Sequence, residues 1–201
     1  FPELFQTINI EPVENYSSYL LDILKSLAPK NCEDDPKIVI LTPGPLNSAY
    51  YEHSFLADTM GVELVQGTDL LVENNITFMR TTKGKQRVDI IYRRIDDDFI
   101  DPLSFNQSSV IGVPGLFDSY RSGNVNICSA PGSGIADDKA IYSYMPEIIR
   151  FYLGQEPILP SIKTWRCGNE KDKQYVLNNL EKLVVKEVHG SGGYGMLIGS
   201  K

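Results

Sequence analysis

The residues best suited to chemistry lie near the end of the chain, where Lys186 precedes a glycine-rich loop. One apolar run, 183–185, leads into this lysine, and a second, 196–198, follows the loop. Short apolar runs bounded by glycines predict strands. Glycines at this density let backbone N–H groups converge on an anion, which a lysine on the preceding strand can also reach. The pattern therefore predicts a phosphate-binding strand–loop–strand unit, with loop contacts from Gly190, Ser191, Gly192, Gly193, Tyr194 and Gly195.

Other phosphate loops share part of this pattern. Gly190, Gly192 and Gly195 satisfy Gly-x-Gly-x-x-Gly. A dinucleotide site, however, requires the motif to open a helix, with an acidic residue about 20 positions later, and here the loop leads into the apolar run 196–198 instead. The loop that ends in Gly-Lys-Ser/Thr is absent, and the protein-kinase loop has its lysine downstream rather than upstream. A glycine-rich hairpin turn without a ligand remains the alternative to phosphate binding.

A second concentration of charge, Arg93-Arg94-Ile95-Asp96-Asp97-Asp98, lies at the end of an expected strand over residues 86–94. One interpretation is a salt-bridged turn in which Asp98 or Asp101 caps the next segment. The other is that an arginine contacts a phosphate or carboxylate, while the aspartates hold a metal or orient that arginine. The residues alone leave both interpretations open.

Polar segments also lie where helices are expected to begin. The apolar strand 37–41 ends in Thr42-Pro43-Gly44-Pro45, at the strand end where open α/β sheets bind ligands. Candidates for substrate binding follow at the next helix entry: Asn47, Ser48, Tyr50, Glu52 and His53. Capping of that helix by Asn47 and Ser48 is an equal alternative. After a second glycine-rich turn, 130–134, Asp137 or Asp138 is expected to cap a helix that begins near Lys139.

Elements that position these residues can be read from periodicity. An amphipathic helix is expected over 16–27, with its apolar stripe in the core. Strand 37–41, a helix closed by Gly61 and strand 62–65 form a βαβ unit, and 69–80 forms a hairpin. Further elements are expected in this order: a short helix (115–121), a strand (124–128), a helix interrupted at Pro146 (135–154), a strand (161–166) and a polar helix (168–180).

Length and charge limit the classes of partner. The 201 residues are 42% hydrophobic and carry a formal net charge of −7, which fits a packed globular protein and argues against general binding to nucleic acid or an anionic membrane. No stretch is long and apolar enough to cross a membrane. Cys32, Cys128 and Cys167 are far apart and predict free thiols in a reducing, cytoplasmic compartment. The start at Phe1 and the stop just after the loop predict a piece of a longer chain.

The order of these parts resembles the ATP-grasp superfamily, in which one lysine begins a helix in an Asp-Lys pair and another precedes the glycine loop. Lys139 and Lys186 match these two positions. The whole chain is similar to the circularly permuted ATP-grasp proteins, a group related to glutathionylspermidine synthetase. The matching stretches are Leu41–Pro45, Asn47–His53, Tyr92–Phe99, Ala130–Lys139 and the final glycine loop.

The resemblance implies an α/β fold: a Rossmann-like pre-ATP-grasp domain with a mixed sheet, then the first part of an ATP-grasp subdomain. It divides the chain into an N-terminal helical segment (1–35), the α/β domain (36–156) and the start of the nucleotide-binding subdomain (157–201).

The same resemblance implies an ATP-dependent carboxylate–amine ligase. The γ-phosphoryl of ATP passes to a small-molecule or peptide carboxylate, and an amine then displaces phosphate from the acyl-phosphate. Lys139 and Lys186 contact the ATP phosphates, the loop covers them, and Arg93 or Arg94 holds the acyl-phosphate or the substrate carboxylate. The family's Mg²⁺ ligands are expected outside these residues, so we predict that this piece alone is inactive.

Two other functions compete with the ligase. A nucleotide-sugar-dependent transferase would use Asp96 and Asp98 to hold a metal–diphosphate. A non-catalytic interaction domain would keep the fold and lack the chemistry. Substitutions separate the ligase from the transferase. Loss of Asp96 or Asp98 abolishes nucleotide binding only in the transferase, and loss of Lys139 or Lys186 abolishes it only in the ligase.

Overall fold

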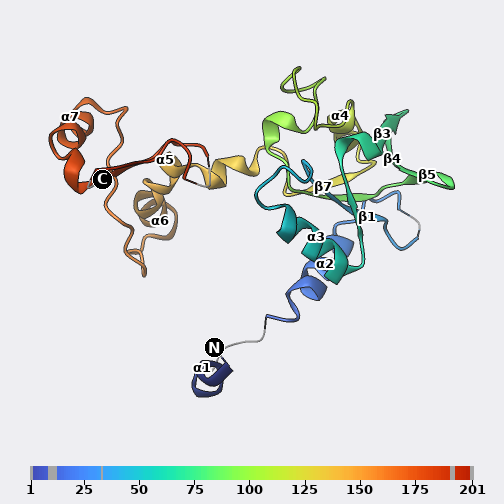
Figure 1. Ribbon diagram of the computed structural model, residues 1–201, viewed down its shortest axis with the longest axis horizontal. Coiled ribbons are helices and arrows are strands. Elements are labelled where there is room, and N and C mark those ends of the chain that lie inside the picture. Colours follow the sequence, from blue (N-terminus) through green and yellow to red (C-terminus); the bar gives the residue numbers. More distant parts are fainter. Residues whose placement is uncertain (1, 9–12, 33, 191–192, 200–201) are drawn as a thin grey trace. The chain divides into compact units, whose positions relative to one another are not determined.

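The computed structural model describes residues 2–8, 13–32, 34–190 and 193–199. The chain forms two compact units: unit 1, Phe1–Pro131, and unit 2, Gly132–Lys201. Their boundary falls in the glycine-rich turn 130–134, earlier than the boundary after residue 156 that the resemblance implies. Figure 1 labels the α-helices of both units and several of the strands.

A four-stranded parallel sheet forms the centre of unit 1. Its strands are β1 (Ile38–Leu41), β2 (Glu63–Val65), β6 (Ile90–Arg93) and β7 (Asn126–Cys128), in the order β2-β1-β6-β7. All four residues of β1 are buried, as expected for an apolar strand that is covered on both faces. Helix α3 (Tyr50–Met60) connects β1 to β2 and ends at Gly61, which has a φ of 66°. The expected βαβ unit is therefore confirmed.

Alternate side chains of this sheet enter two separate cores. On one face Ile38, Ile40 and Ile90 pack with Leu24 of α2 (Tyr16–Ser26) and with residues of α3. The opposite core is larger and contains residues of the sheet and of the elements that cover it: Val39, Leu41, Val65, Leu70, Met79, Val88, Ile91, Ile95, Ile100, Val113, Leu116, Val125 and Ile127. Helices α2 and α3 therefore cover one face of the sheet, where Figure 1 shows them beside each other.

A three-stranded antiparallel sheet contributes to the larger core. It contains β3 (Leu70–Glu73), β4 (Ile76–Thr81) and β5 (Gly84–Arg87), and a 3₁₀ turn, η1 (Gly67–Asp69), leads into it. The β3–β4 hairpin turns at Asn74 and Asn75, which have φ values of 51° and 59°. Positive φ at both central residues is the requirement of a type I′ turn, so the expected hairpin is confirmed. Unit 1 also contains α1 (Pro2–Thr7), η2 (Asp97–Phe99) and α4 (Leu116–Arg121).

Unit 2 is mainly helical and includes a two-stranded antiparallel sheet. Its elements are η3 (Ser133–Asp137), α5 (Lys139–Tyr142), α6 (Met145–Leu153), α7 (Glu170–Asn178), η4 (Leu180–Lys182), β8 (Val184–Val185) and β9 (Leu197–Ile198). The interruption expected at Pro146 separates α5 from α6, and α6 ends at Gly154. Among the described apolar side chains of unit 2, only that of Val176 is buried.

The expectation of one strand over residues 86–94 is wrong, because two strands in different sheets occupy this range. β5 pairs with β4, whereas β6 pairs with β1 and β7. Between them the N–H of Val88 donates to Thr77 and the N–H of Asp89 donates to Lys37. The chain therefore crosses from one sheet to the other at two residues that the apolar pattern does not mark.

The strand expected over residues 161–166 is also absent, and the segment has no regular structure. Its larger side chains stack on other elements instead. The rings of Trp165 and Tyr175 lie 4.7 Å apart, and the Arg166 guanidinium lies 3.8 Å from the centre of the Tyr144 ring. The described residues give this segment no neighbouring strand, so its backbone forms no ladder.

The apolar stripe of α2 is only partly in the core, contrary to expectation. Leu24 is fully buried and Leu20 and Leu21 are partly buried, but Tyr16, Tyr19 and Ile23 are exposed. The helix packs against α3 along one narrow side, which leaves the neighbouring apolar positions outside the contact.

The α/β fold class is confirmed, with parallel pairs in one sheet and antiparallel pairs in the others. No helix in the described ranges combines the length and apolar composition that crossing a bilayer requires.

Candidate functional site

The glycine loop of unit 2 connects the two strands of a short hairpin, as the sequence predicts. Val184 pairs with Ile198 and Val185 pairs with Leu197. Lys186 directly follows β8 rather than lying within it. Gly195 has a φ of 62°, and a Cβ at this position would overlap the Glu187 side chain. Glycine is favoured here because the positive φ strains any residue with a side chain, and the Glu187 side chain would also have to move.

Lys139 is joined to the stem of this loop. Asp138 caps α5, and its side chain accepts hydrogen bonds from the N–H groups of Ala140 and Ile141. The Lys139 backbone N–H donates to the carbonyl of Val188 (3.2 Å), and its ammonium donates to the carbonyl of Gly190 (2.6 Å). The expected cap by Asp138 is therefore confirmed, and it places the ammonium of the next residue at the loop.

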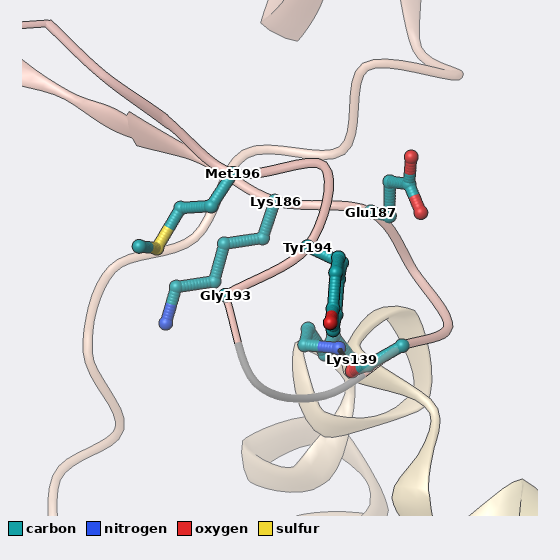
Figure 2. A pocket seen from close by; sticks show the side chains of 7 residues that line it. Lys139, Lys186, Glu187, Gly193, Tyr194 and Met196 are labelled. Atoms are coloured by element: carbon teal, nitrogen blue, oxygen red, sulfur yellow. Dashed lines mark hydrogen bonds between the residues drawn. The ribbon is translucent and has the colours of Figure 1, made fainter. Parts of the chain in front are cut away.

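Lys186 and Lys139 border the same pocket, which has a volume of about 180 Å³. Its other lining residues are Glu187, Gly190, Gly193, Tyr194 and Met196. Figure 2 shows that the Glu187 carboxylate points away from the Lys186 ammonium. Lys186 is exposed and forms no ion pair or hydrogen bond with the described residues. Ser191 and Gly192, which the sequence places among the loop contacts, lie outside the described residues.

Two ammonium groups beside a glycine loop can neutralise the oxygens of a phosphate chain. The pocket is nevertheless small, because sites that enclose drug-sized ligands have volumes of about 300–1,000 Å³. This pocket therefore fits the phosphate part of a nucleotide rather than the whole molecule.

In unit 1 the two candidate arginines point to opposite faces of the sheet. Arg93 is 9% exposed and forms an ion pair with Asp97 (2.7 Å). Its guanidinium also donates to three backbone carbonyls, those of Ser129, Ile95 and Ala130. For Arg93 and Asp97 the salt-bridged turn is therefore the observed arrangement, and this guanidinium fastens the loops that follow β6 and β7.

Arg94 is exposed, and its guanidinium lies 5.9 Å from the centre of the Tyr92 ring. Its backbone N–H donates to the carbonyl of Leu41 (2.8 Å), which brings it beside the end of β1. Thr42, the next residue after β1, contacts Nδ1 of His53 through its hydroxyl (2.9 Å). Arg94, Thr42 and His53 therefore lie together at the carboxyl end of the parallel sheet.

His53 is 2% exposed, so it does not present the open binding surface that the sequence suggests for it. Burial, and then the positive charge of Arg94, lower the pKa of its imidazole, while the Glu52 carboxylate acts in the opposite direction. The neutral form is thus favoured. The hydrogen bond to Thr42 ties the first turn of α3 to the end of β1.

The other candidate residues of this segment are more open. Asn47 accepts a hydrogen bond from the N–H of Ala49 (2.9 Å). The first turn of α3 nevertheless has no side-chain cap, so the alternative that Asn47 or Ser48 caps this helix is wrong. Ser48 and Glu52 are exposed, and Tyr50 is partly exposed.

Two of the aspartates after β6 have structural contacts, Asp97 and Asp101. Asp97 pairs with Arg93, whereas Asp96 precedes the 3₁₀ turn η2 without a side-chain cap. Asp101 is fully buried and accepts hydrogen bonds from the N–H groups of Leu103, Gly115 and Phe117. Among the described residues, no group of three or more His, Cys, Asp or Glu side chains is arranged to hold a metal ion.

Three residues of these sites were not among the sequence candidates. Glu187 and Met196 line the phosphate-sized pocket, and their positions next to Lys186 and Gly195 were the available signal. Thr42 was visible only as part of the turn after β1, and nothing in the sequence pairs its hydroxyl with His53.

A family model described as a circularly permuted ATPgrasp matches residues 1–201. An uncharacterized protein from Synechocystis sp. is 56% identical over 199 residues, which cover 99% of this chain and 41% of the relative. An uncharacterized protein from Mycobacterium tuberculosis is 50% identical over 199 residues, which cover 99% of this chain and 36% of the relative. The chain therefore spans about two-fifths of the length of these relatives.

A third relative, from Frankia alni, has the provisional name glutamate–cysteine ligase 2-3. It is 39% identical over 198 residues, which cover 98% of this chain but only 23% of that protein. Its name thus describes a polypeptide that lies mostly outside the match. The family model, in contrast, covers every residue, and the chain therefore belongs to the circularly permuted ATP-grasp family.

Proposed function

We propose that this chain is the nucleotide-phosphate-binding part of an ATP-dependent carboxylate–amine ligase. The observation that carries the proposal is the pocket bordered by Lys139, Lys186 and the glycine loop. ATP supplies the γ-phosphoryl group that converts a carboxylate into an acyl-phosphate, which an amine then attacks. The family membership and the ligase name of the Frankia relative support this reaction class.

The residues of the chain act in this proposal by charge and position. Lys186 has an ammonium that pairs with none of the described residues, and it neutralises phosphate oxygens at the pocket. Lys139 holds the carbonyl of Gly190 and can exchange that carbonyl for a phosphate oxygen. On the substrate side the proposal keeps Arg93 and Arg94, together with Asn47, Ser48, Tyr50, Glu52 and His53. Mg²⁺ ligands are proposed to lie in the additional length that the relatives have.

The test measures binding of a fluorescent ATP analogue to residues 1–201. Lys186→Met and Lys139→Met are expected to weaken binding about tenfold or more, because each removes a charged contact of about 1.5 kcal/mol or more. Lys182→Met is the matched control, because Lys182 is an exposed lysine in the 3₁₀ turn just before β8. Equal binding by Lys186→Met and Lys182→Met would reject the phosphate site.

Turnover is tested separately. Residues 1–201 are expected to release no ADP from ATP, whereas the longer Synechocystis relative is expected to release ADP when a carboxylate and an amine are both present. ADP release by residues 1–201 that Lys186→Met abolishes would show that the prediction of inactivity is wrong. Loss of metal-dependent nucleotide binding in Asp96→Ala or Asp98→Ala, with both lysine variants unaffected, would favour the nucleotide-sugar transferase.

A further inference from the structure

The hairpin formed by β4 and β5 is basic, although the chain as a whole is acidic. Residues 80–87 contain four of the 19 lysines and arginines of the chain and none of its 26 acidic residues. Lys85 and Arg87 form ion pairs with carboxylates of unit 1. Arg80 and Lys83 are exposed, and their side chains form no ion pair or hydrogen bond with the described residues. The end of this hairpin therefore presents positive charge that the described chain does not compensate.

Two of these cations lie on one face of the hairpin. Met79 of β4 enters the larger core, so the next residue, Arg80, points to the opposite face. Arg80 is directly opposite Lys85 in the register of the two strands, so both side chains share that face. Like charges at directly opposed positions destabilise a pair of strands. Glu73 compensates Lys85 but not Arg80, so an acidic side chain from outside the hairpin would relieve the remaining repulsion.

The backbone of β5 adds a free edge beside this charge. β5 is the last strand in the order β3-β4-β5, and no described strand pairs with its other side. The N–H of Val88 donates to the carbonyl of Thr77, which continues the register of the hairpin and fixes its alternation of hydrogen-bonded pairs. By this alternation the N–H and C=O groups of Lys85 and Arg87 point away from β4. An unpaired row of backbone groups of this kind can accept an added strand.

The charge on this edge decides which strand it accepts. A second copy of the hairpin would bring cations against cations, and edge strands commonly avoid pairing with themselves in this way. A nucleic acid would use the positive charge but not the row of backbone groups, and the net charge of −7 opposes its approach. A strand with acidic side chains uses both features, because its backbone pairs with β5 while its carboxylates meet Arg80 and Lys83.

We propose that the free edge of β5 binds an extended acidic segment of another polypeptide as an added strand. The carboxylates of this segment lie on the face that carries Arg80 and Lys85. The aspartates at 34–35 line a groove of about 480 Å³ with Arg87, so the segment has uncharged residues at that end. The proposal is independent of the proposed function, because none of these residues borders the nucleotide pocket.

The experiment titrates ¹⁵N-labelled residues 1–201 with a short peptide of alternating glutamate and valine, without nucleotide. Parallel titrations use the same peptide with lysine in place of glutamate, and the glutamate peptide with N-methylated backbone amides. The signals followed are the amides of Lys85 and Arg87, and only the unmethylated glutamate peptide is expected to shift them saturably. Arg80→Gln is expected to weaken this binding about threefold, the effect of one exposed charge pair. Arg121→Gln changes an exposed arginine in α4 and is expected to leave binding unchanged.

Two changes of Lys85 separate strand pairing from attraction between charges. Lys85→Gln and Lys85→Pro both remove the ammonium, but only Lys85→Pro also removes the N–H at the free edge, which the ladder to β4 does not use. Lys85→Gln is expected to weaken binding about threefold, and Lys85→Pro is expected to abolish it. Hydrogen exchange in β4 shows whether the hairpin is intact in Lys85→Pro. The N-methylated peptide makes the same distinction with the unaltered protein.

The remaining outcomes overturn the proposal. Absence of a saturable shift with the glutamate peptide, or unaltered binding by Arg80→Gln, rejects the site. Equal binding of the methylated and unmethylated peptides rejects pairing along the edge of β5. Tighter binding of a single-stranded oligonucleotide than of the glutamate peptide assigns the charge to nucleic acid instead. Because no nucleotide is present and all signals come from unit 1, failure of the ATP proposal would leave this result intact.

Discussion

The two units of the chain differ in how they use their apolar residues. Unit 1 buries them in two cores on either side of a parallel sheet, and strands β1 and β6 contribute buried residues to both cores. Unit 2 has comparable side chains, but among its described residues only Val176 is buried. Burial of apolar area is the main favourable term in folding, so unit 1 contains the buried core that stabilises it, whereas the described residues of unit 2 contain little of one.

The exposed apolar residues of unit 2 are concentrated on α6 and the segment after it. They include Phe151, Tyr152, Leu153, Ile158, Leu159 and Ile162. Large apolar patches on a protein surface mark places where another segment or another protein packs. More than half the length of the Synechocystis and Mycobacterium relatives lies outside the matched stretch. We expect such additional chain to cover this part of unit 2.

The largest difference between the two units is expected when one leucine is removed from each. Leu41→Ala in β1, at a fully buried position, is expected to cost about 3 kcal/mol of unfolding free energy. Leu153→Ala in α6, at an exposed position, should change stability by less than about 0.5 kcal/mol. Hydrogen exchange of β1 and β6 amides reports unit 1 during urea unfolding. Fluorescence of Trp165, the single tryptophan, reports unit 2. Similar costs for both variants would show that α6 is packed after all.

Two capping carboxylates give a second, smaller contrast. Asp101 in unit 1 is fully buried and accepts three backbone hydrogen bonds, so Asp101→Ala is expected to cost about 2–3 kcal/mol. Asp138 in unit 2 caps a short, largely exposed helix, and Asp138→Ala should cost about 1 kcal/mol. Hydrogen exchange in α4 and α5 measures both. A larger loss of stability from Asp138→Ala than from Asp101→Ala would contradict this contrast and would show that unit 2 has a stable core of its own.

The two histidines give the smallest expected difference between the units, a difference in how stability depends on pH. The pKa of His53 is lowered in the folded protein, first by burial and then by Arg94. The unfolded chain therefore takes up this proton first as the pH falls. The stabilisation from neutral His53 is complete above the unfolded pKa of about 6.5, and it is lost as the pH falls toward the folded pKa.

Unit 1 is thus expected to lose stability as the pH falls below about 6.5. His53→Gln should remove this part of the slope in urea unfolding followed by hydrogen exchange in β1. His189→Gln, at an exposed position in unit 2, is the control and should leave the slope unchanged. A slope that persists in His53→Gln would assign it to other groups.

Local signals were sufficient for the elements whose boundaries are set by a few adjacent residues. Gly61 ends α3, Asn74-Asn75 makes the hairpin turn, and the glycines around 190–195 separate β8 from β9. Elements that depend on a distant partner were not predictable in this way. The chain changes sheets at Val88 and Asp89 because their N–H groups bond to Thr77 and Lys37. Residues 161–166 form no strand because no described strand lies beside them.

The candidate sites show the same division. Residue type and order predicted the loop with Lys186, and the family resemblance added Lys139, which lines the same pocket. Residue type and order were not enough to separate Arg93 from Arg94. Alternation along β6 predicts opposite faces for the two arginines. Which arginine is fully hydrogen-bonded, however, depends on the carbonyls of Ser129 and Ala130, which follow β7 and accept hydrogen bonds from Arg93.

The hydrogen bond from the Lys139 ammonium to the Gly190 carbonyl has a consequence for any measurement of affinity. A nucleotide that recruits this ammonium must displace an acceptor already in place, so the binding constant reports the difference between two contacts. The freed carbonyl then requires a new donor, from water or from the ligand. Tight binding would thus coincide with a rearranged loop stem, and weak binding with the stem left as it is.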